Sequence, residues 1–249
     1  MARIGLMLYS VRLACADDFQ GTLAAIAALG YEGVEVFDLH GHAVTDVRGW
    51  LDELGLAVCG LHAPLDAVEA DLAGLAATAQ ALGTSRLVVS WVSPPASAAD
   101  VTEIRDRLVA AAAATSRLGL ALGFHNHDGE LRSFGDDSSL LEQLLADVPE
   151  LFLELDLGWV WFAGADPSAL VARVNGRAPL MHIKDFRNRD EPSFCPVGDG
   201  AVGYDVVAPA AVASGVEWLL VEQDEVDGPE LDAAARSLKA LADFVSVSA

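Results

Sequence analysis

The stretch PLMHIK at residues 179–184 is a short apolar run that carries a histidine and a lysine two positions apart. Only two lysines, Lys184 and Lys239, occur among the fifteen basic residues of the chain. Side chains on a β-strand alternate between its two faces, so His182 and Lys184 would point to the same side. Burying a cation beside an imidazole is costly unless both line a polar cavity. The stretch therefore predicts a buried strand that contributes to a functional site.

Seven further strand-like runs are spaced along the chain, with longer segments between them. The runs lie at 3–9, 32–37, 56–62, 86–91, 119–126, 151–157 and 216–222. The segments between them have apolar residues at three- and four-residue spacing, which is typical of amphipathic helices. Examples lie at 17–29, 66–82, 98–117 and 228–246. Strands that alternate with helices predict a parallel sheet with helical crossovers.

Eight such units in 249 residues fit a (β/α)8 TIM barrel. A doubly wound open sheet is the alternative fold, but it usually has a glycine-rich phosphate loop after its first strand. The segment YSVR at 9–12 is not such a loop. No linker, low-complexity tract or break in composition divides the sequence. We therefore predict one α/β domain, a TIM barrel that spans residues 1–249.

The composition argues against several classes of partner. The net charge is −22 and the pI is near 4.3, whereas a surface that binds nucleic acid is basic. No apolar run is long enough to cross a bilayer, and residues 1–8 lack the layout of a signal peptide. The three cysteines have no metal-type spacing and favour reduced thiols. We expect a soluble cytoplasmic protein without a nucleic-acid or membrane partner.

Polar residues gather at the carboxyl ends of the predicted strands, where a TIM barrel builds its active site. Asp156, His182 and Glu222 come from three successive strands. Two carboxylates and an imidazole are a mixed oxygen and nitrogen donor set for a divalent cation such as Mn²⁺, Mg²⁺ or Co²⁺. Without a cation, two buried carboxylates so close together would repel each other. We therefore predict that these three residues bind a metal ion.

Other polar residues near strand ends have plainer alternatives. A single histidine such as His62 is often a hydrogen-bonded structural residue, and Glu35 alone could anchor a loop. His40 and His42 have the spacing of a metal clip, but they lie in a glycine-bearing loop where we expect them to be solvated. Trp91, Trp159 and Trp161 could either pack in the core or form the apolar wall of a sugar pocket.

Several motifs resemble those of one known superfamily. They are FHNHDGEL at 124–131, ELDLGW at 154–159, AGADP at 163–167, MHIKD at 181–185, VGDG at 197–200 and VEQD at 221–224. Over nearly its full length the chain resembles the xylose isomerase-like TIM-barrel superfamily (sugar phosphate isomerase/epimerase, AP endonuclease family 2 type). This superfamily also holds ketose 3-epimerases, inosose dehydratases and endonuclease IV. The fifth-strand motif resembles that of a subgroup often described only as isomerase/epimerase.

The resemblance implies a particular set of site residues. Ketose 3-epimerases hold their metal with Glu, Asp, His and Glu from strands five to eight, and the last three correspond to Asp156, His182 and Glu222. The first glutamate aligns near His125, so either this imidazole replaces a carboxylate or three protein ligands are joined by water. A substrate-binding glutamate of the family falls close to Glu130. Trp159 stands where epimerases have a substrate-binding histidine.

The chemistry that suits such a site is deprotonation of a carbon next to a carbonyl, through an enediolate stabilised by a cation. We predict Glu222 as the base, with His125, Glu130 or Lys184 as its partner in proton transfer. Lys184 could instead hold a hydroxyl or an anion of the substrate, or form an ion pair with Asp156 or Glu154. The predicted substrate-binding residues are His62, His127, Trp159, Glu35 and Arg187.

We therefore predict a metal-dependent isomerase or epimerase of a keto-sugar or sugar phosphate, with Mn²⁺ as the first choice of metal. A dehydratase or lyase that acts on an inosose or a 3-keto-glycoside is the alternative, because the same enediolate can expel a β-hydroxyl. An endonuclease fits poorly with the acidic composition. A barrel that only binds a ligand or a partner is the non-enzymatic alternative. Barrels of this family often form dimers, so we leave a homodimer as an alternative to a monomer.

Overall fold

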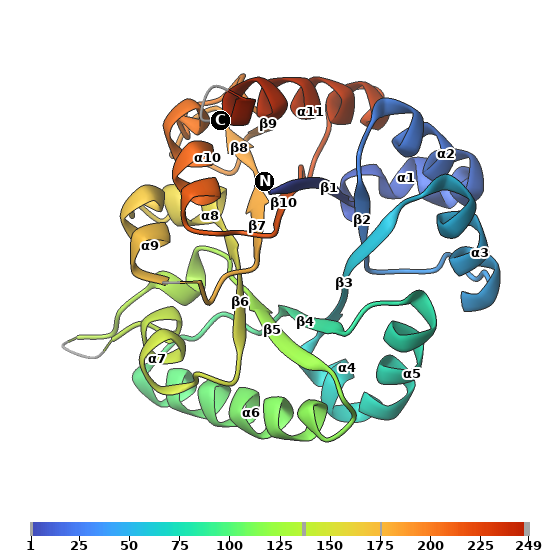
Figure 1. Ribbon diagram of the computed structural model, residues 1–249. Helices are drawn as coiled ribbons and strands as arrows, with labels where there is room; N and C mark the ends of the chain where they lie inside the picture. Colours follow the sequence, from blue (N-terminus) through green and yellow to red (C-terminus); the bar gives the residue numbers. More distant parts are fainter. Residues whose placement is uncertain (1, 136–137, 175, 247–249) are drawn as a thin grey trace.

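Eight parallel strands close into a barrel in the computed structural model, which describes residues 2–135, 138–174 and 176–246 (Figure 1). The strands are β1 (Arg3–Met7), β2 (Gly33–Val36), β3 (Ala57–Pro64), β4 (Arg86–Trp91), β5 (Ala121–His125), β6 (Phe152–Asp156), β7 (Leu180–Ile183) and β10 (Trp218–Val221). Around the barrel their order is β1-β10-β7-β6-β5-β4-β3-β2, so neighbours in the chain are neighbours in space. The prediction of a single-domain TIM barrel is confirmed.

Helices surround the barrel on its outside, as the view along the barrel shows (Figure 1). The α-helices are α1 (Arg12–Asp17), α2 (Phe19–Leu29), α3 (Val44–Leu54), α4 (Leu65–Ala70), α5 (Leu72–Leu82), α6 (Ala98–Ser116), α7 (Leu140–Asp147), α8 (Leu157–Phe162), α9 (Pro167–Val174), α10 (Tyr204–Ala213) and α11 (Glu230–Ser246). Two short 3-10 helices, η1 (Leu8–Val11) and η2 (Gly129–Leu131), follow β1 and β5. A two-stranded antiparallel sheet of β8 (Asp185–Phe186) and β9 (Phe194–Cys195) lies outside the barrel.

One segment that we predicted as a single helix, 66–82, is divided by an aspartate. Asp71 separates α4 from α5, and its carboxylate accepts a hydrogen bond from the backbone N–H of Gly74. Asp18 likewise separates α1, which we did not predict, from α2, which matches the predicted helix at 17–29, and it accepts from Gly21. An aspartate in this position begins a new helix, because it satisfies an N–H group that has no partner within the helix.

The interior of the barrel is apolar toward the beginnings of the strands. Cys59, Val88, Leu180, Trp218 and Leu220 form a buried cluster there. Inward-facing glycines leave room for the larger side chains, because a Cβ at Gly33 would lie 2.7 Å from the Trp218 ring. Leu180 and Leu220 each precede a polar residue, His182 and Glu222, by two positions on the same inward face. The apolar cluster is therefore the floor on which the polar residues rest.

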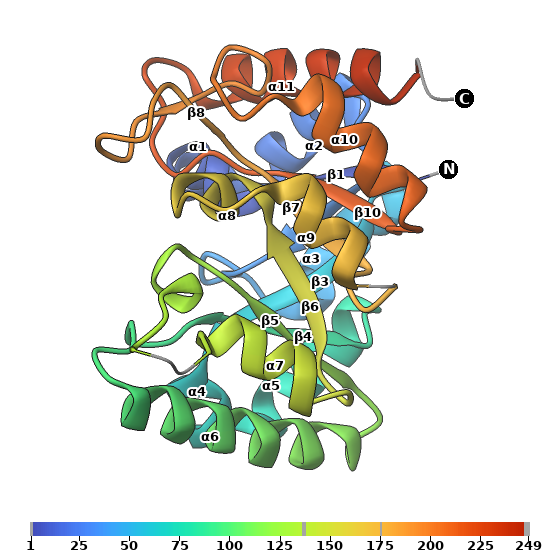
Figure 2. The same ribbon diagram turned by 90° about the vertical axis from the view of Figure 1, so that its left-hand side faces the viewer.

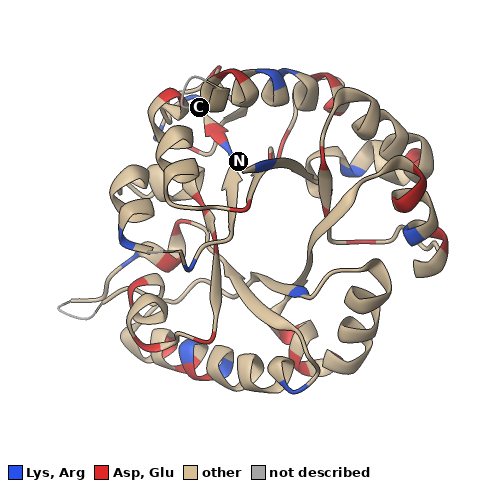
Figure 3. Cartoon of the chain, in the orientation of Figure 1, with Lys and Arg blue, Asp and Glu red and all other residues tan. Residues whose placement is uncertain are grey.

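Acidic residues also lie along the outer helices, with fewer basic ones between them (Figure 3). In the side view, β1 begins on the right, whereas α8 and β8, which follow the carboxyl ends of strands, lie on the left (Figure 2). No helix within the described ranges is long and apolar enough to span a membrane.

Candidate metal centre and active site

Strand register brings the predicted ligands together. Asp156 on β6 pairs in register with His182 on β7, and His125 on β5 pairs with Glu154 on β6. Glu222 directly follows β10, whose Val221 pairs with Ile183 of β7. His182 itself pairs with Leu220, so Glu222 lies one inward-facing position farther along, and the ends of β5, β6, β7 and β10 carry these side chains to the same end of the barrel.

One group of side chains, which we call the Lys184 group, consists of Asp156, Lys184, Glu222 and Asp224. The ammonium Nζ of Lys184 lies 2.8 Å from Glu222 Oε2, 2.9 Å from Asp224 Oδ1 and 3.2 Å from Asp156 Oδ2. His182 and Lys184 thus face the same interior, since both contact Glu222. Of the two predicted ion-pair partners of Lys184, Asp156 is present, whereas Glu154 contacts histidines instead.

A second group, the His182 ring, consists of Glu35, His62, Glu154 and His182 and is buried beneath the first. His182 Nε2 lies 2.7 Å from Glu35 Oε2 and 3.2 Å from Glu154 Oε2. His62 Nε2 lies 3.0 and 2.7 Å from the same two oxygens, so imidazoles and carboxylates alternate around the ring. The other nitrogen of His182, Nδ1, lies 2.8 Å from Glu222 Oε2. His182 therefore connects the two groups.

Asp156 is held in place by the helix that follows it. Its Oδ1 accepts a hydrogen bond of 2.8 Å from the backbone N–H of Trp159, which makes Asp156 the N-cap of α8. Asn126 accepts from the backbone N–H of Asp156 and fixes the strand end from the other side. The remaining oxygen, Oδ2, is buried and faces the ammonium of Lys184 at 3.2 Å. It therefore already lies against a cation, and a metal ion would share it with Lys184.

The charges of the His182 ring depend on its carboxylates. Burial disfavours the charged imidazolium of His62, but Glu35 and Glu154 outweigh burial and raise its pKa to about 10. Glu154 and Glu222 raise the pKa of His182 well above its usual value against the same effect of burial. Conversely, burial raises the pKa of Glu154, but His182 and His62 hold it well below its usual value.

The Lys184 group has a different balance. Burial raises the pKa of Asp156 to about 6, although Lys184 acts in the opposite direction. Burial also raises the pKa of Asp224. For Glu222, Lys184 and His182 outweigh burial and hold the pKa well below its usual value. Burial and the neighbouring His182 lower the pKa of His125 to about 4, which leaves this imidazole neutral at pH 7.

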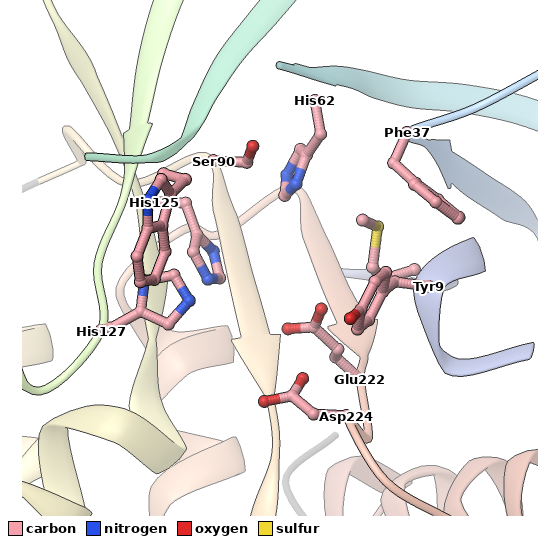
Figure 4. Close-up of a pocket in the computed structure, with 10 residues that line it drawn as sticks. Tyr9, Phe37, His62, Ser90, His125, His127, Glu222 and Asp224 are labelled. Atoms are coloured by element: carbon pink, nitrogen blue, oxygen red, sulfur yellow. The ribbon is translucent and has the colours of Figure 1, made fainter. Parts of the chain in front are cut away.

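A cavity of about 370 Å³ opens above these groups at the carboxyl ends of the strands. It is lined by Met7, Tyr9, Phe37, His62, Ser90, Trp91, His125, His127, Glu222 and Asp224. Figure 4 shows His125 and His127 on one side of it, Glu222 and Asp224 on another, and Tyr9 and Phe37 on a third. A cavity with few polar groups among aromatic ones is typical of a small-molecule site.

The structure places the predicted substrate-binding residues at different depths. His62 and His127 line the cavity. Trp159 is buried next to it, with its ring 5.2 Å from Lys184 Nζ. Glu35 is fully buried in the His182 ring, below the cavity. Arg187 is half exposed beyond β8, near Asp227, and is not among the lining residues.

Three other predictions concern residues at the edge of the site. Glu130, predicted as a proton-transfer partner, is buried in η2, where its Oε2 accepts from the backbone N–H of His127 at 2.6 Å. It therefore holds the segment that carries His127. His40 packs against Phe19 and is half buried, while His42 is exposed, and neither lines the cavity.

Sequence reasoning did not include Asp224 and Glu154 among the site residues. Asp224 lines the cavity and contacts Lys184, and Glu154 joins three histidines in the interior. The signal for Glu154 was its position two residues before Asp156, which places both on the inward face of β6. Asp224 lies beyond the end of β10, where strand alternation no longer predicts direction.

The residues present fit a divalent cation. His125, Asp156, His182 and Glu222 are buried, and each offers one ligand atom within 4.8 Å of the others. Imidazole nitrogens and carboxylate oxygens suit Mn²⁺ and Co²⁺. Asp156 Oδ2 accepts no hydrogen bond and has only the ammonium of Lys184 beside it, so it is a suitable ligand atom. An overlapping set of donors, His62, His125, Glu154 and His182, lies deeper among the described residues.

Comparison with known families gives a match over most of the chain. The family described as "Xylose isomerase-like TIM barrel" matches residues 23–244. A comparison with curated proteins gave no match.

Solved structures share the fold at low sequence identity. A sugar phosphate isomerase/epimerase from Parabacteroides distasonis has a TM-score of 0.87 and 19% identity, covering 98% of this chain and 100% of that one. An L-ribulose 3-epimerase has a TM-score of 0.76 and 18% identity over 100% and 96% of the two chains. A probable 3-DHS dehydratase from Bacillus anthracis has a TM-score of 0.78 and 15% identity over 96% and 98%. At these identities the similarity establishes the fold alone.

Proposed function

The chain belongs to the xylose isomerase-like TIM-barrel family, and from this premise we propose that it is a divalent-metal-dependent isomerase or epimerase of a keto-sugar. The reaction would move a proton at a carbon next to the carbonyl group, through an enediolate of the substrate. One observation carries the proposal. Asp156, His182, Glu222 and His125 converge beneath a cavity that could hold a small carbohydrate.

The metal would be held by Asp156, His182, Glu222 and His125, with Mn²⁺ as the expected ion. When bound, such a cation polarises the carbonyl and stabilises the negative charge that develops on its oxygen. Its charge would also offset the three carboxylates that surround the single ammonium of Lys184. Metal binding at this position is therefore favoured by the charge of the site as well as by its donor atoms.

Proton transfer falls to the residues that face the cavity. Glu222 lines it and is ionised at neutral pH, because Lys184 and His182 outweigh burial and keep its pKa low. It is our choice for the base that removes the proton. His125 is neutral and lies on the opposite side of the cavity (Figure 4), so it would receive or return a proton when water takes its place as the fourth metal ligand. Lys184 would hold a hydroxyl or the carbonyl oxygen of the substrate.

A dehydratase is the second candidate, and Asp224 is the observation that favours it. Burial raises the pKa of this carboxyl, which lines the cavity beside Lys184. In its protonated form this carboxyl group can donate a proton to a hydroxyl that leaves from the neighbouring carbon, and a raised pKa makes that form easier to reach. Elimination would then follow the same first deprotonation as isomerisation.

The test is to supply the purified protein with Mn²⁺ and incubate it in D₂O with keto-sugars, inososes and 3-keto-glycosides. We expect NMR to show exchange of the proton next to the carbonyl for at least one substrate, and the product then separates isomerisation from elimination. Metal analysis accompanies this assay. Less than about a tenth of an equivalent of bound metal would contradict the metal site. Full metal occupancy without exchange on any substrate would favour a binding protein.

A further inference from the structure

We propose that the site takes an unphosphorylated, ring-shaped keto-polyol, and that Asp185 fills the place where a phosphate group would otherwise bind. The choice of a keto-polyol rests on the proposed function, whereas the exclusion of phosphate rests on separate contacts. TIM barrels frequently bind phosphate with the loops that follow the seventh and eighth strands and with the start of a short helix nearby. In this chain the segment after β7 runs from Lys184 to Gly203, before α10.

The backbone N–H groups of that segment converge on the side chain of Asp185. Its Oδ2 accepts from Gly198 at 2.9 Å and from Gly200 at 3.1 Å. Its Oδ1 accepts from Phe186 at 3.0 Å and from Val202 at 3.2 Å. Several backbone N–H groups that converge on one anion form the kind of concavity that binds phosphate in other proteins. Here the anion is a carboxylate of the chain itself.

The fit of this carboxylate is close. Asp185 is only 1% exposed. A Cβ at Gly200 would lie 2.2 Å from Asp185 Oδ1, so a residue with a side chain could not occupy that position without displacing the carboxylate. A free phosphate group cannot reach these N–H groups while Asp185 remains in place.

Further N–H groups at this end of the barrel are also taken by carboxylates of the chain. Glu230 accepts from Leu13 and Ala14 in the first turn of α1, at 3.3 and 2.9 Å. Asp156 accepts from Trp159 at the start of α8, and Glu130 accepts from His127 after β5. These N–H groups are therefore not available to an anionic substrate.

The cavity itself disfavours an anion. Its described lining contains the carboxylates Glu222 and Asp224 but no lysine or arginine, and its charged imidazole, His62, already lies against Glu35 and Glu154. The nearest ammonium, that of Lys184, already contacts three carboxylates. A phosphate carries close to two negative charges at neutral pH and would meet like charge here, while the cations within reach are already paired with carboxylates.

The rim of the cavity favours a ring with an apolar face. Tyr9 and Trp91 are 37% and 49% exposed, although large aromatic side chains are usually buried. Tyr9 packs edge-on against Phe37, with ring centroids 5.3 Å apart. Trp91 packs edge-on against His127 at the same separation. These aromatic groups offer apolar surface to the C–H face of a sugar ring, while the carboxylates below can accept its hydroxyl hydrogens.

The first experiment removes the internal anion. Asp185→Ala should unmask the N–H groups, so 10 mM inorganic phosphate should raise its melting temperature by about 2–4 °C relative to chloride at equal ionic strength. Wild type and Asp190→Ala, which removes an exposed carboxylate between β8 and β9, should show no such rise. Equal stabilisation of all three proteins, or of none, would overturn the exclusion of phosphate. Asp185→Ser, whose side chain is too short to reach all four N–H groups, replaces Asp185→Ala if the latter does not fold.

The second experiment compares matched substrates with the Mn²⁺-loaded wild type in D₂O. The pairs are D-fructose with D-fructose 6-phosphate and D-ribulose with D-ribulose 5-phosphate, and methyl 3-keto-glucoside serves as a closed ring. We expect the proton next to the carbonyl to exchange at least about tenfold faster in the unphosphorylated compounds, fastest in the closed ring. Faster exchange of the phosphates overturns this inference but leaves the proposed function intact. Absence of both proton exchange and bound Mn²⁺ would contradict the proposed function. The melting experiment would still test separately whether Asp185 excludes phosphate.

Discussion

The Lys184 group and the His182 ring lie one above the other in the same barrel, and both combine carboxylates with nitrogen cations. In the Lys184 group a single ammonium serves three carboxylates, and Glu222 and Asp224 reach the cavity. In the His182 ring two imidazoles alternate with two carboxylates, all of them buried. The upper group is short of positive charge, whereas the lower one can balance its charges internally.

This difference assigns different tasks to carboxylates that look alike in the sequence. A group that lacks positive charge and borders a cavity is suited to bind a cation and a substrate. A buried ring whose charges compensate each other is suited to fix the orientation of its members. His182 belongs to both, with Nε2 in the ring and Nδ1 toward Glu222. We infer that the ring orients the imidazole that the upper group uses.

The largest effect should come from the upper group. Glu222→Gln keeps the shape of the side chain but removes the base, so the rate of proton exchange should fall by about 10²- to 10⁴-fold. Circular dichroism should remain that of the wild type. Glu225→Gln, a change of an exposed glutamate three residues further on, is the matched control and should retain the wild-type rate. Exchange at the normal rate in Glu222→Gln would show that the base lies elsewhere.

A change in the lower ring should act on the metal rather than on the base. Glu35 lies 2.7 Å from His182 Nε2, so it can hold the proton on that nitrogen and leave Nδ1 free to bind. Glu35→Gln should weaken Mn²⁺ binding by about 10- to 100-fold in a titration followed by electron paramagnetic resonance. Glu53→Gln, at an exposed position on α3, should bind as the wild type does. Unchanged affinity in Glu35→Gln would separate the ring from the metal site.

The contrast between the groups also marks what the sequence could predict. The barrel follows from local patterns, since the apolar run at 86–91 coincides with β4 and the others agree within a few residues. Convergence of Asp156, His182 and Glu222 follows from topology, because all parallel strands of a barrel end on the same side. These inferences need only the direction of each strand.

Depth within the barrel could not be predicted in the same way. Strand alternation shows that Glu35 faces inward, but whether it meets substrate or lies beneath other residues depends on side chains from β3, β6 and β7. The position of Arg187 depends on the path of the β8–β9 hairpin, which has no helix or strand period to reveal it. The contact of Asp185 with Gly198 and Gly200 likewise joins residues that only the folded segment brings together.

The pH dependence of metal binding would sharpen the inferred role of His182. Glu154 and Glu222 outweigh burial and raise its pKa well above the usual value, so both ring nitrogens carry protons in the metal-free protein at neutral pH. A metal can bind Nδ1 only after its proton leaves, so the affinity for Mn²⁺ should rise with pH. We expect about a tenfold gain per pH unit for each proton released, between pH 6 and pH 8. Calorimetry in buffers with different heats of ionisation would count these protons, and a count of zero would contradict protonation of His182.

The smallest effect should lie at the rim, above both groups. Trp91 is half exposed, lines the cavity and packs against His127. If its ring only adds contact area for the substrate, Trp91→Ala should raise KM by roughly 3- to 10-fold and leave kcat unchanged, because it removes binding that substrate and transition state share. The affinity for Mn²⁺ should not change, since the substitution removes no metal ligand. The control Leu118→Ala, at another exposed apolar position, should change neither KM nor kcat. A fall in kcat or in Mn²⁺ affinity would mean that the rim positions the groups below it, and the division of the barrel end into separate layers would then fail.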